Sequence, residues 1–206
     1  MRITIDPADI VVEIFSVTLA ILLALGIGAW QTRVHDRQRL NGSVGNIVAE
    51  LRSNRAMLER ERPRHARILA ELYAGERRAG STQYVSERAY HAALSAGAPH
   101  GSGLAIPRST AWQIAQTGQT LDLMPYAIRA RLTGLYDLQA FYFTDEQQFV
   151  EQMLSVSAPP NGNYYWTTSV LQARLQDLVN LEDELQRQYR STAGDLRKRY
   201  PDARSS

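Results

Sequence analysis

Residues 10–30 read IVVEIFSVTLAILLALGIGAW, and this stretch decides how the rest of the chain is organised. No charged residue occurs from Ile14 to Thr32. As an α-helix, residues 10–30 would extend roughly 30 Å, which is the thickness of the hydrocarbon core of a bilayer. Trp30 stands where an aromatic anchor at the membrane interface is usual. The sequence therefore predicts one transmembrane helix at residues 10–30, preceded by a short tail and helix start at residues 1–9.

The charges before this span favour a permanent anchor over a cleaved signal peptide. A signal peptide has a positively charged start and a shorter apolar core. Here Asp6, Asp9 and Glu13 stand against Arg2 alone. We therefore expect the helix to stay attached to a soluble domain at residues 31–206.

Positive charge is concentrated directly after the span, at Arg33, Arg37 and Arg39. By the positive-inside rule, these arginines and the interfacial Trp30 predict a single-pass protein of a bacterial inner membrane with its soluble domain in the cytoplasm. The excess of positive charge after the span over that before it is small, so a periplasmic soluble domain is the alternative.

Small residues recur every four positions within the span, at Ser16, Ala20, Ala24 and Gly28. Such a stripe lets membrane helices approach closely, so it is a candidate packing face for a second copy or a membrane-protein partner. The general frequency of small residues in membrane helices is the other explanation. Glu13 lies three residues before Ser16, where it either belongs to this face or reaches the lipid headgroups.

Apolar residues at helical spacing predict an all-α fold for the soluble domain. Asn41-Gly42 is a predicted break, and Pro63 is predicted to end or kink the helix that precedes it. The sequence shows no convincing strand. We expect a helical bundle that ends in a long antiparallel hairpin, with helices at residues 43–62, 63–75, 82–96, 108–117, 125–156 and 164–200.

The composition excludes some classes of function. The chain has 206 residues, with 23 Lys and Arg against 21 Asp and Glu, and this balance gives no argument for nucleic-acid binding. The absence of cysteine excludes disulfides and thiol chemistry. Lys198 is the only lysine, a usage typical of GC-rich bacterial genomes.

The sequence offers no catalytic, metal or cofactor signature, so we predict neither an enzyme nor a cofactor. Glu61 and His65 are four residues apart, but Pro63 separates them and one pair is not a metal site. The four histidines, at positions 35, 65, 91 and 100, are interpreted as ordinary solvated residues. Gly101-Ser102-Gly103 follows no predicted strand, so it is interpreted as a flexible loop.

A basic cluster at the predicted Pro63 break is the candidate partner surface of the soluble domain, together with Trp112. An arginine cluster can bind phosphate or an acidic protein, although interleaved glutamates also allow a solvated face with local ion pairs. The cluster consists of Arg60, Arg62, Arg64 and Arg67.

Two short stretches resemble an uncharacterised family of small bacterial single-pass membrane proteins. One stretch comprises Glu13-Ile14, Leu22-Leu23-Ala24-Leu25 and Trp30; the other runs from Thr110-Ala111-Trp112-Gln113-Ile114 through Thr117-Gly118 to residues 121–124. The arginine-rich tract after Trp30 replaces the Asn-Asn-Trp-Asn-Glu-like exit of that family. The resemblance implies a membrane anchor and a helical domain, and it implies no activity.

These features predict a membrane-anchored interaction or scaffold protein that associates through its membrane helix and its helical surface. The alternative is a membrane-anchored sensor or ligand-binding domain that faces the periplasm. That alternative requires a pocket near Trp112 and the aromatic helix.

Overall fold

The structure, a computed structural model, describes residues 7–80, 84–97, 105–154, 159 and 161–203. The side chains of residues 7–15, 17, 79 and 154 lie outside this description. The described part of the chain is all-α, as the sequence predicts, and its one β-type pairing is an isolated bridge between Ser86 and Asn163. The elements are α1 (Pro7–Ala79), α2 (Glu87–Gly97), α3 (Thr110–Thr117), the 3₁₀ helix η2 (Thr120–Leu123), α4 (Tyr126–Leu154) and α5 (Tyr165–Arg199).

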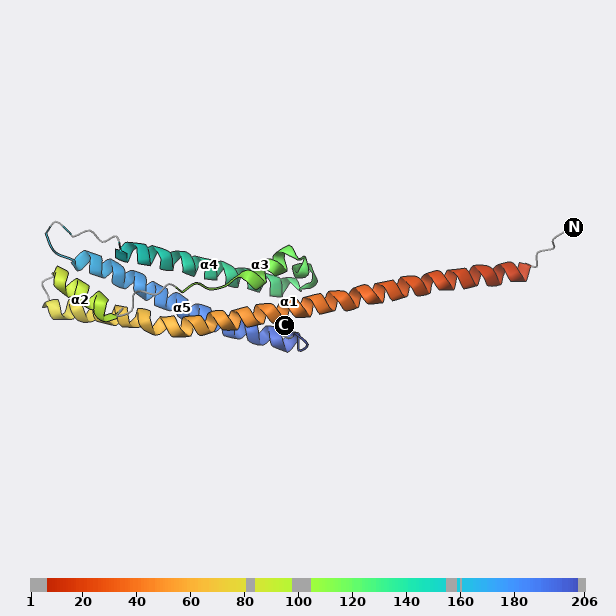
Figure 1. Cartoon of the computed structure of the whole chain (residues 1–206), viewed down its shortest axis with the longest axis horizontal. Coiled ribbons are helices and arrows are strands. Elements are labelled where there is room, and N and C mark those ends of the chain that lie inside the picture. The colour runs from red at the N-terminus through yellow and green to blue at the C-terminus, as the bar shows by residue number, and fades with distance from the viewer. Residues whose placement is uncertain (1–6, 81–83, 98–104, 155–158, 160, 204–206) are drawn as a thin grey trace.

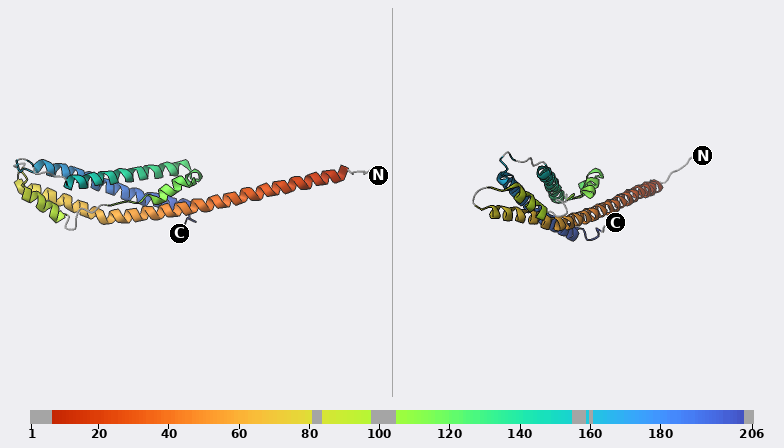
Figure 2. Two further views of the ribbon diagram at one scale, coloured as in Figure 1. Left: turned by 45° about the horizontal axis from the view of Figure 1, so that its top comes forward. Right: turned by 60° about the vertical axis from the view of Figure 1, so that its left-hand side comes forward.

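One very long helix gives the molecule its shape (Figure 1). The C-terminal half of α1 packs lengthwise against α5, which in turn packs against α4. The N-terminal part of α1 projects from one end of this bundle (Figures 1 and 2). The ion pairs Arg131–Asp195 and Arg174–Asp145 join opposite ends of α4 and α5, so these two helices form the predicted antiparallel hairpin.

The three long helices share one packing pattern. Their core-facing positions alternate in steps of three and four residues, which keeps one seam of each helix facing its neighbours. Polar residues occupy this seam as well as apolar ones, and most of its positions are buried. The seam comprises residues 44, 47, 51, 54, 58, 61, 65, 68 and 72 in α1, residues 132, 135, 139, 142, 146 and 149 in α4, and residues 171, 175, 178, 182, 185, 189, 192 and 196 in α5.

The predicted break at Asn41-Gly42 and the predicted helix end at Pro63 are wrong, because α1 continues through both positions. Glycine costs about 1 kcal/mol within a helix, and proline removes one backbone hydrogen bond. Leu58 and His65 are buried on either side of Pro63, and Pro63 itself is exposed. Packing of the seam on both sides of the proline therefore outweighs the local preference for a break.

An extended segment, residues 105–109, threads the bundle between α1 and α4 and leads into α3. Ala105 is buried, and the backbone of Arg108 is hydrogen-bonded to Asn54 of α1. The predicted short helix is confirmed as α3, which ends at Thr117 and is followed by Gly118. The predicted loop Gly101-Ser102-Gly103 and His100 lie outside the described residues.

No helix in the described part of the chain is both long enough and apolar enough to cross a membrane. Where the side chains of the projecting part of α1 are described, they are exposed. Ser16, Ala20, Ala24 and Gly28 belong to this exposed part, whereas the side chain of Glu13 lies outside the description.

Candidate functional site

The strongest concentration of chemistry lies inside the bundle, where one layer of the seam carries ionisable side chains. His65 comes from α1, Glu182 from α5, and Glu146 and Tyr142 from α4. Each of these side chains is at most 1% exposed. The layer joins three helices, and we call these four residues the buried histidine–carboxylate cluster.

Short contacts link the members of the cluster. Nδ1 of His65 lies 2.8 Å from Oε1 of Glu182, and the Tyr142 hydroxyl donates to the same oxygen at 3.1 Å. On the other side of the imidazole, Nε2 of His65 lies 3.9 Å from Oε1 of Glu146. That oxygen accepts a hydrogen bond from the backbone N–H of Ala105 at 2.8 Å. Glu146 therefore connects the ionisable layer to the extended segment.

Burial and charge set the protonation of the cluster. Desolvation raises the pKa of Glu146 to about 7, although the Ala105 N–H and the nearby His65 oppose this change. Burial by itself would lower the pKa of His65, but the hydrogen bond and negative charge of Glu182, with the charge of Glu146, raise its pKa overall. The cluster can thus hold a proton near neutral pH.

The interpretation of His65 as a solvated residue is wrong. It lies at a buried seam position, and its Nδ1 is hydrogen-bonded to the buried Glu182. The cluster lines neither of the two grooves described below. No group of three or more histidine or acidic side chains in the described residues has an arrangement that could hold a metal ion.

A second polar layer clamps the extended segment. Asn54 accepts a hydrogen bond from the Arg108 N–H at 2.9 Å and donates to the Arg108 carbonyl at 2.7 Å. Gln139 donates to that carbonyl at 3.1 Å and accepts from the Tyr189 hydroxyl at 2.7 Å. Because a non-helical segment leaves backbone groups unpaired, these side chains supply the partners that burial requires.

Glu50 extends this clamp to the start of α3. Its Oε2 accepts from the Ala111 N–H at 2.8 Å, and its Oε1 accepts from the Tyr136 hydroxyl at 2.7 Å. Tyr136 stacks on Trp112, with ring centroids 5.1 Å apart. Trp112 is only 6% exposed, so the predicted role of this residue in a partner surface does not agree with its position in the core.

The predicted arginine cluster is divided between ion pairs and solvent. Arg62 donates through two nitrogens to the carboxylate of Asp183 on α5, and Arg64 pairs with Glu61 at 2.7 Å. Arg60 and Arg67 are exposed. The interpretation as a solvated face with local ion pairs therefore fits Arg60, Arg64 and Arg67, whereas Arg62 pairs with another helix.

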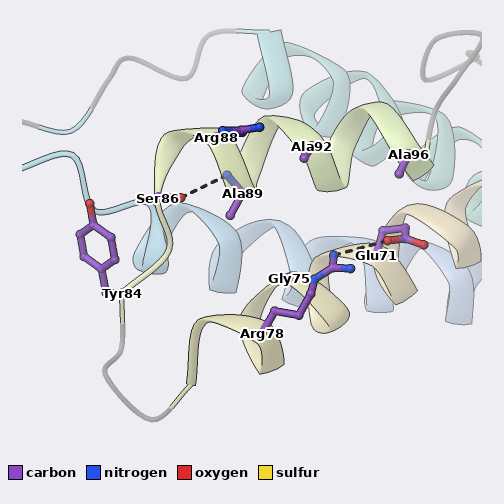
Figure 3. Close-up of a pocket in the computed structure, with 9 residues that line it drawn as sticks. All are labelled: Glu71, Gly75, Arg78, Tyr84, Ser86, Arg88, Ala89, Ala92 and Ala96. Atoms are coloured by element: carbon purple, nitrogen blue, oxygen red, sulfur yellow. Dashed lines mark hydrogen bonds and ion pairs between the residues drawn. The ribbon is translucent and has the colours of Figure 1, made fainter.

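The described residues line two grooves of similar volume. The first, of about 580 Å³, lies between α2 and the end of α1 (Figure 3). Its charged lining consists of Arg88 and the pair Arg78–Glu71, separated by 3.7 Å. Small side chains such as Ala92 and Ala96 form much of the remainder. The second groove, of about 570 Å³, lies between α4 and α5 near the end from which α1 projects.

Most residues of the two polar layers escape sequence reasoning because a polar side chain does not count toward an apolar stripe, and among them only His65 is interpreted from the sequence, as a solvated residue. The signal that could have found them is the seam itself. Asn54, His65, Gln139, Glu146 and Glu182 all occupy the positions that the alternating step of three and four assigns to the core.

None of the family models, curated proteins or solved structures compared with the chain matches it. The resemblance to small bacterial membrane proteins in two short stretches therefore stays a prediction.

Proposed function

We propose that this chain is a membrane-anchored helical interaction protein. In this proposal the projecting part of α1 crosses the bilayer, and the bundle at residues 31–206 is held beside it to bind other proteins. Association would involve both the membrane helix and the surface of the bundle. The orientation with the bundle in the cytoplasm follows from Arg33, Arg37 and Arg39.

The observation that carries the proposal is the exposure of large apolar side chains around the projecting helix. Ile21, Leu22 and Leu23 are 55%, 61% and 58% exposed. Successive residues of an α-helix point about 100° apart, so these three side chains face three directions. A helix that is apolar on all sides needs apolar surroundings on all sides, which lipid supplies and a one-sided protein groove does not.

The flanking residues support the same assignment. Trp30 is 64% exposed at the end of the apolar stretch, where an indole would lie at the headgroups. Arg33, Arg37 and Arg39 follow on the same helix and are exposed. In the sequence the uncharged run also extends back to Ile14, beyond the first described side chain, and three further apolar residues at positions 10–12 precede Glu13.

Because α1 is one continuous helix, the proposed anchor is mechanically coupled to the bundle. The same helix that carries Trp30 enters the bundle at Val44 and remains in the core to Leu72. From Trp30 to Leu72 this helix extends roughly 60 Å. A partner that turns or shifts the membrane part would therefore act directly on the packing layers of the bundle.

The alternative role as a ligand-binding sensor requires a pocket near Trp112. Trp112 is instead packed on Tyr136, and it lines neither of the two described grooves. No observation on the described residues favours the sensor over the interaction protein.

The natural absence of cysteine allows a direct test. Single variants Ala24→Cys and Gln38→Cys, both exposed on α1 in this structure, are exposed to a membrane-impermeant maleimide in proteoliposomes. We expect Gln38→Cys on the outward-facing molecules to react and Ala24→Cys to react only after denaturation in detergent. Equal labelling of the two sites in intact vesicles would contradict the anchor.

A further inference from the structure

The second groove lies at the end of the bundle from which the proposed anchor projects. It is formed by the first turns of α4 and the last turns of α5. Two contacts place this end beside the exit of α1. Arg39 donates to the Gly118 carbonyl at 2.8 Å, and Arg37 lies 3.7 Å from Asp202, just beyond α5.

The groove is therefore close to the surface that the anchor would enter. Arg37 follows Trp30 by seven residues, which is roughly 10 Å along a helix. The headgroup layer extends several ångströms beyond the hydrocarbon core. With Trp30 at the interface, the anchor end of the bundle lies within reach of lipid headgroups.

The lining of the groove combines an apolar floor with cations. Ala127, Ile128 and Leu196 supply the apolar part. Arg131 is held by Asp195 at 2.6 Å and by Ser191 at 2.9 Å, so its charge is already balanced. Lys198 and Arg199 are exposed at the rim, and neither has a carboxylate partner within the residues that the structure describes.

We propose that this groove binds the headgroup phosphate of an anionic phospholipid in the bilayer that α1 enters, with Lys198 and Arg199 as the residues that hold it. This inference rests on the proposed function. An exposed ammonium and an exposed guanidinium match a phosphate, since both donate charge-assisted hydrogen bonds to its oxygens. The apolar floor matches the glycerol and first acyl carbons of the same lipid. The lipid contact would thereby hold the bundle against the membrane surface, so that α1 is not its only attachment.

A simpler account of the same cations is available and predicts a different result. Positive residues in the last turn of a helix stabilise its dipole. That effect depends on the helix alone, so it requires no lipid and gives no preference for anionic headgroups. Sensitivity to lipid charge therefore separates the two accounts.

The test uses the full chain in nanodiscs of phosphatidylcholine, alone or with phosphatidylglycerol. A fluorophore on Tyr126→Cys, a site at the start of α4 that is exposed, reports quenching by a spin label on lipid headgroups. We expect stronger quenching when phosphatidylglycerol is present and a loss of this difference at high salt. Lys198→Gln with Arg199→Gln should weaken the apparent affinity for phosphatidylglycerol about tenfold.

The matched control is Arg77→Gln with Arg88→Gln, which removes the same charge at the opposite end of the bundle. It should leave the quenching unchanged. Equal quenching in both lipids, or quenching that persists in the Lys198 and Arg199 variant, would overturn the lipid site. A chain that fails to enter either nanodisc would instead refute the anchor, so the two proposals fail in different ways.

Discussion

The imidazole of His65 lies 2.8 Å from the carboxylate of Glu182, and this contact joins the helix that carries the proposed anchor to the last helix of the chain. Both side chains are buried. Glu146 and Tyr142 complete the same layer from α4. An ionisable layer between three otherwise well-packed helices makes the stability of the bundle dependent on pH.

Glu146→Gln should flatten that pH dependence. A glutamate in the unfolded chain releases its proton near its ordinary pKa of 4.5, whereas burial holds the pKa of Glu146 at about 7 in the fold. Between these values the folded state binds more protons, so the free energy of unfolding falls as pH rises. The raised pKa of His65 acts in the same direction, because its contribution is present at acidic pH and is lost as pH rises through the folded pKa.

We therefore expect Glu146→Gln to be more stable than the parent at about pH 8 and to lose that advantage toward about pH 5. Urea unfolding in detergent, followed by the fluorescence of buried Trp112, measures the free energy of unfolding of both proteins at each pH. Glu151→Gln, at an exposed position of the same helix, is the control and should follow the parent curve. A Glu146→Gln curve parallel to the parent would refute the protonation assigned to the cluster.

Glu182→Leu should destabilise the bundle by about 3 kcal/mol, because it leaves His65 and the Tyr142 hydroxyl buried without their shared acceptor. Arg187→Ala, which breaks an exposed ion pair with Glu184, should cost less than about 1 kcal/mol. Chemical denaturation at neutral pH compares the two. Similar, small losses of stability in the two variants would mean that the contacts of Glu182 contribute little to the free energy of unfolding.

Asn54→Leu should loosen the extended segment before it unfolds the bundle. The substitution removes the acceptor of the Arg108 N–H and a donor to its carbonyl, at a cost of about 2 kcal/mol. Hydrogen exchange should accelerate at Arg108 and Ala111 more than in the middle of α5. Uniform acceleration along the whole chain would contradict a local clamp.

Ala20→Leu with Ala24→Leu tests the small-residue stripe as a packing face of the membrane helix. Larger side chains would hold two helices apart, so any oligomer formed through this face should weaken. Cross-linking of the full chain in detergent and in membranes measures this effect. Leu23→Ile with Leu25→Ile is the control, and an unchanged oligomer in the alanine variant would exclude the stripe as an interface.

Sequence reasoning captured the elements whose local signals agree with their packing. The apolar residues Val44, Ile47 and Leu51 predict a buried helix face, and the structure buries all three. The break at Gly118 and the antiparallel pairing of the last two helices were equally accessible from the sequence.

Other features depend on contacts that sequence spacing alone does not reveal. Pro63 predicts the end of a helix or a kink, but α1 continues through it with buried residues on both sides. The polar character of His65 and Glu146 predicts exposure, although both occupy core positions of the seam. Their burial becomes predictable only when core positions are assigned by the alternating spacing of three and four residues, whether the residue at each position is apolar or polar. Their pairing partners are separated in sequence by up to 117 positions.

The central claim is that the projecting part of α1 resides in lipid, and carbonate extraction of membranes that contain the full chain tests it most directly. We predict that the chain stays with the membrane pellet and floats with it in a density gradient. Leu22→Asp with Leu25→Asp should release it, whereas Gln31→Asp with Gln38→Asp should not. Recovery of the unmodified chain in the carbonate wash would contradict the account.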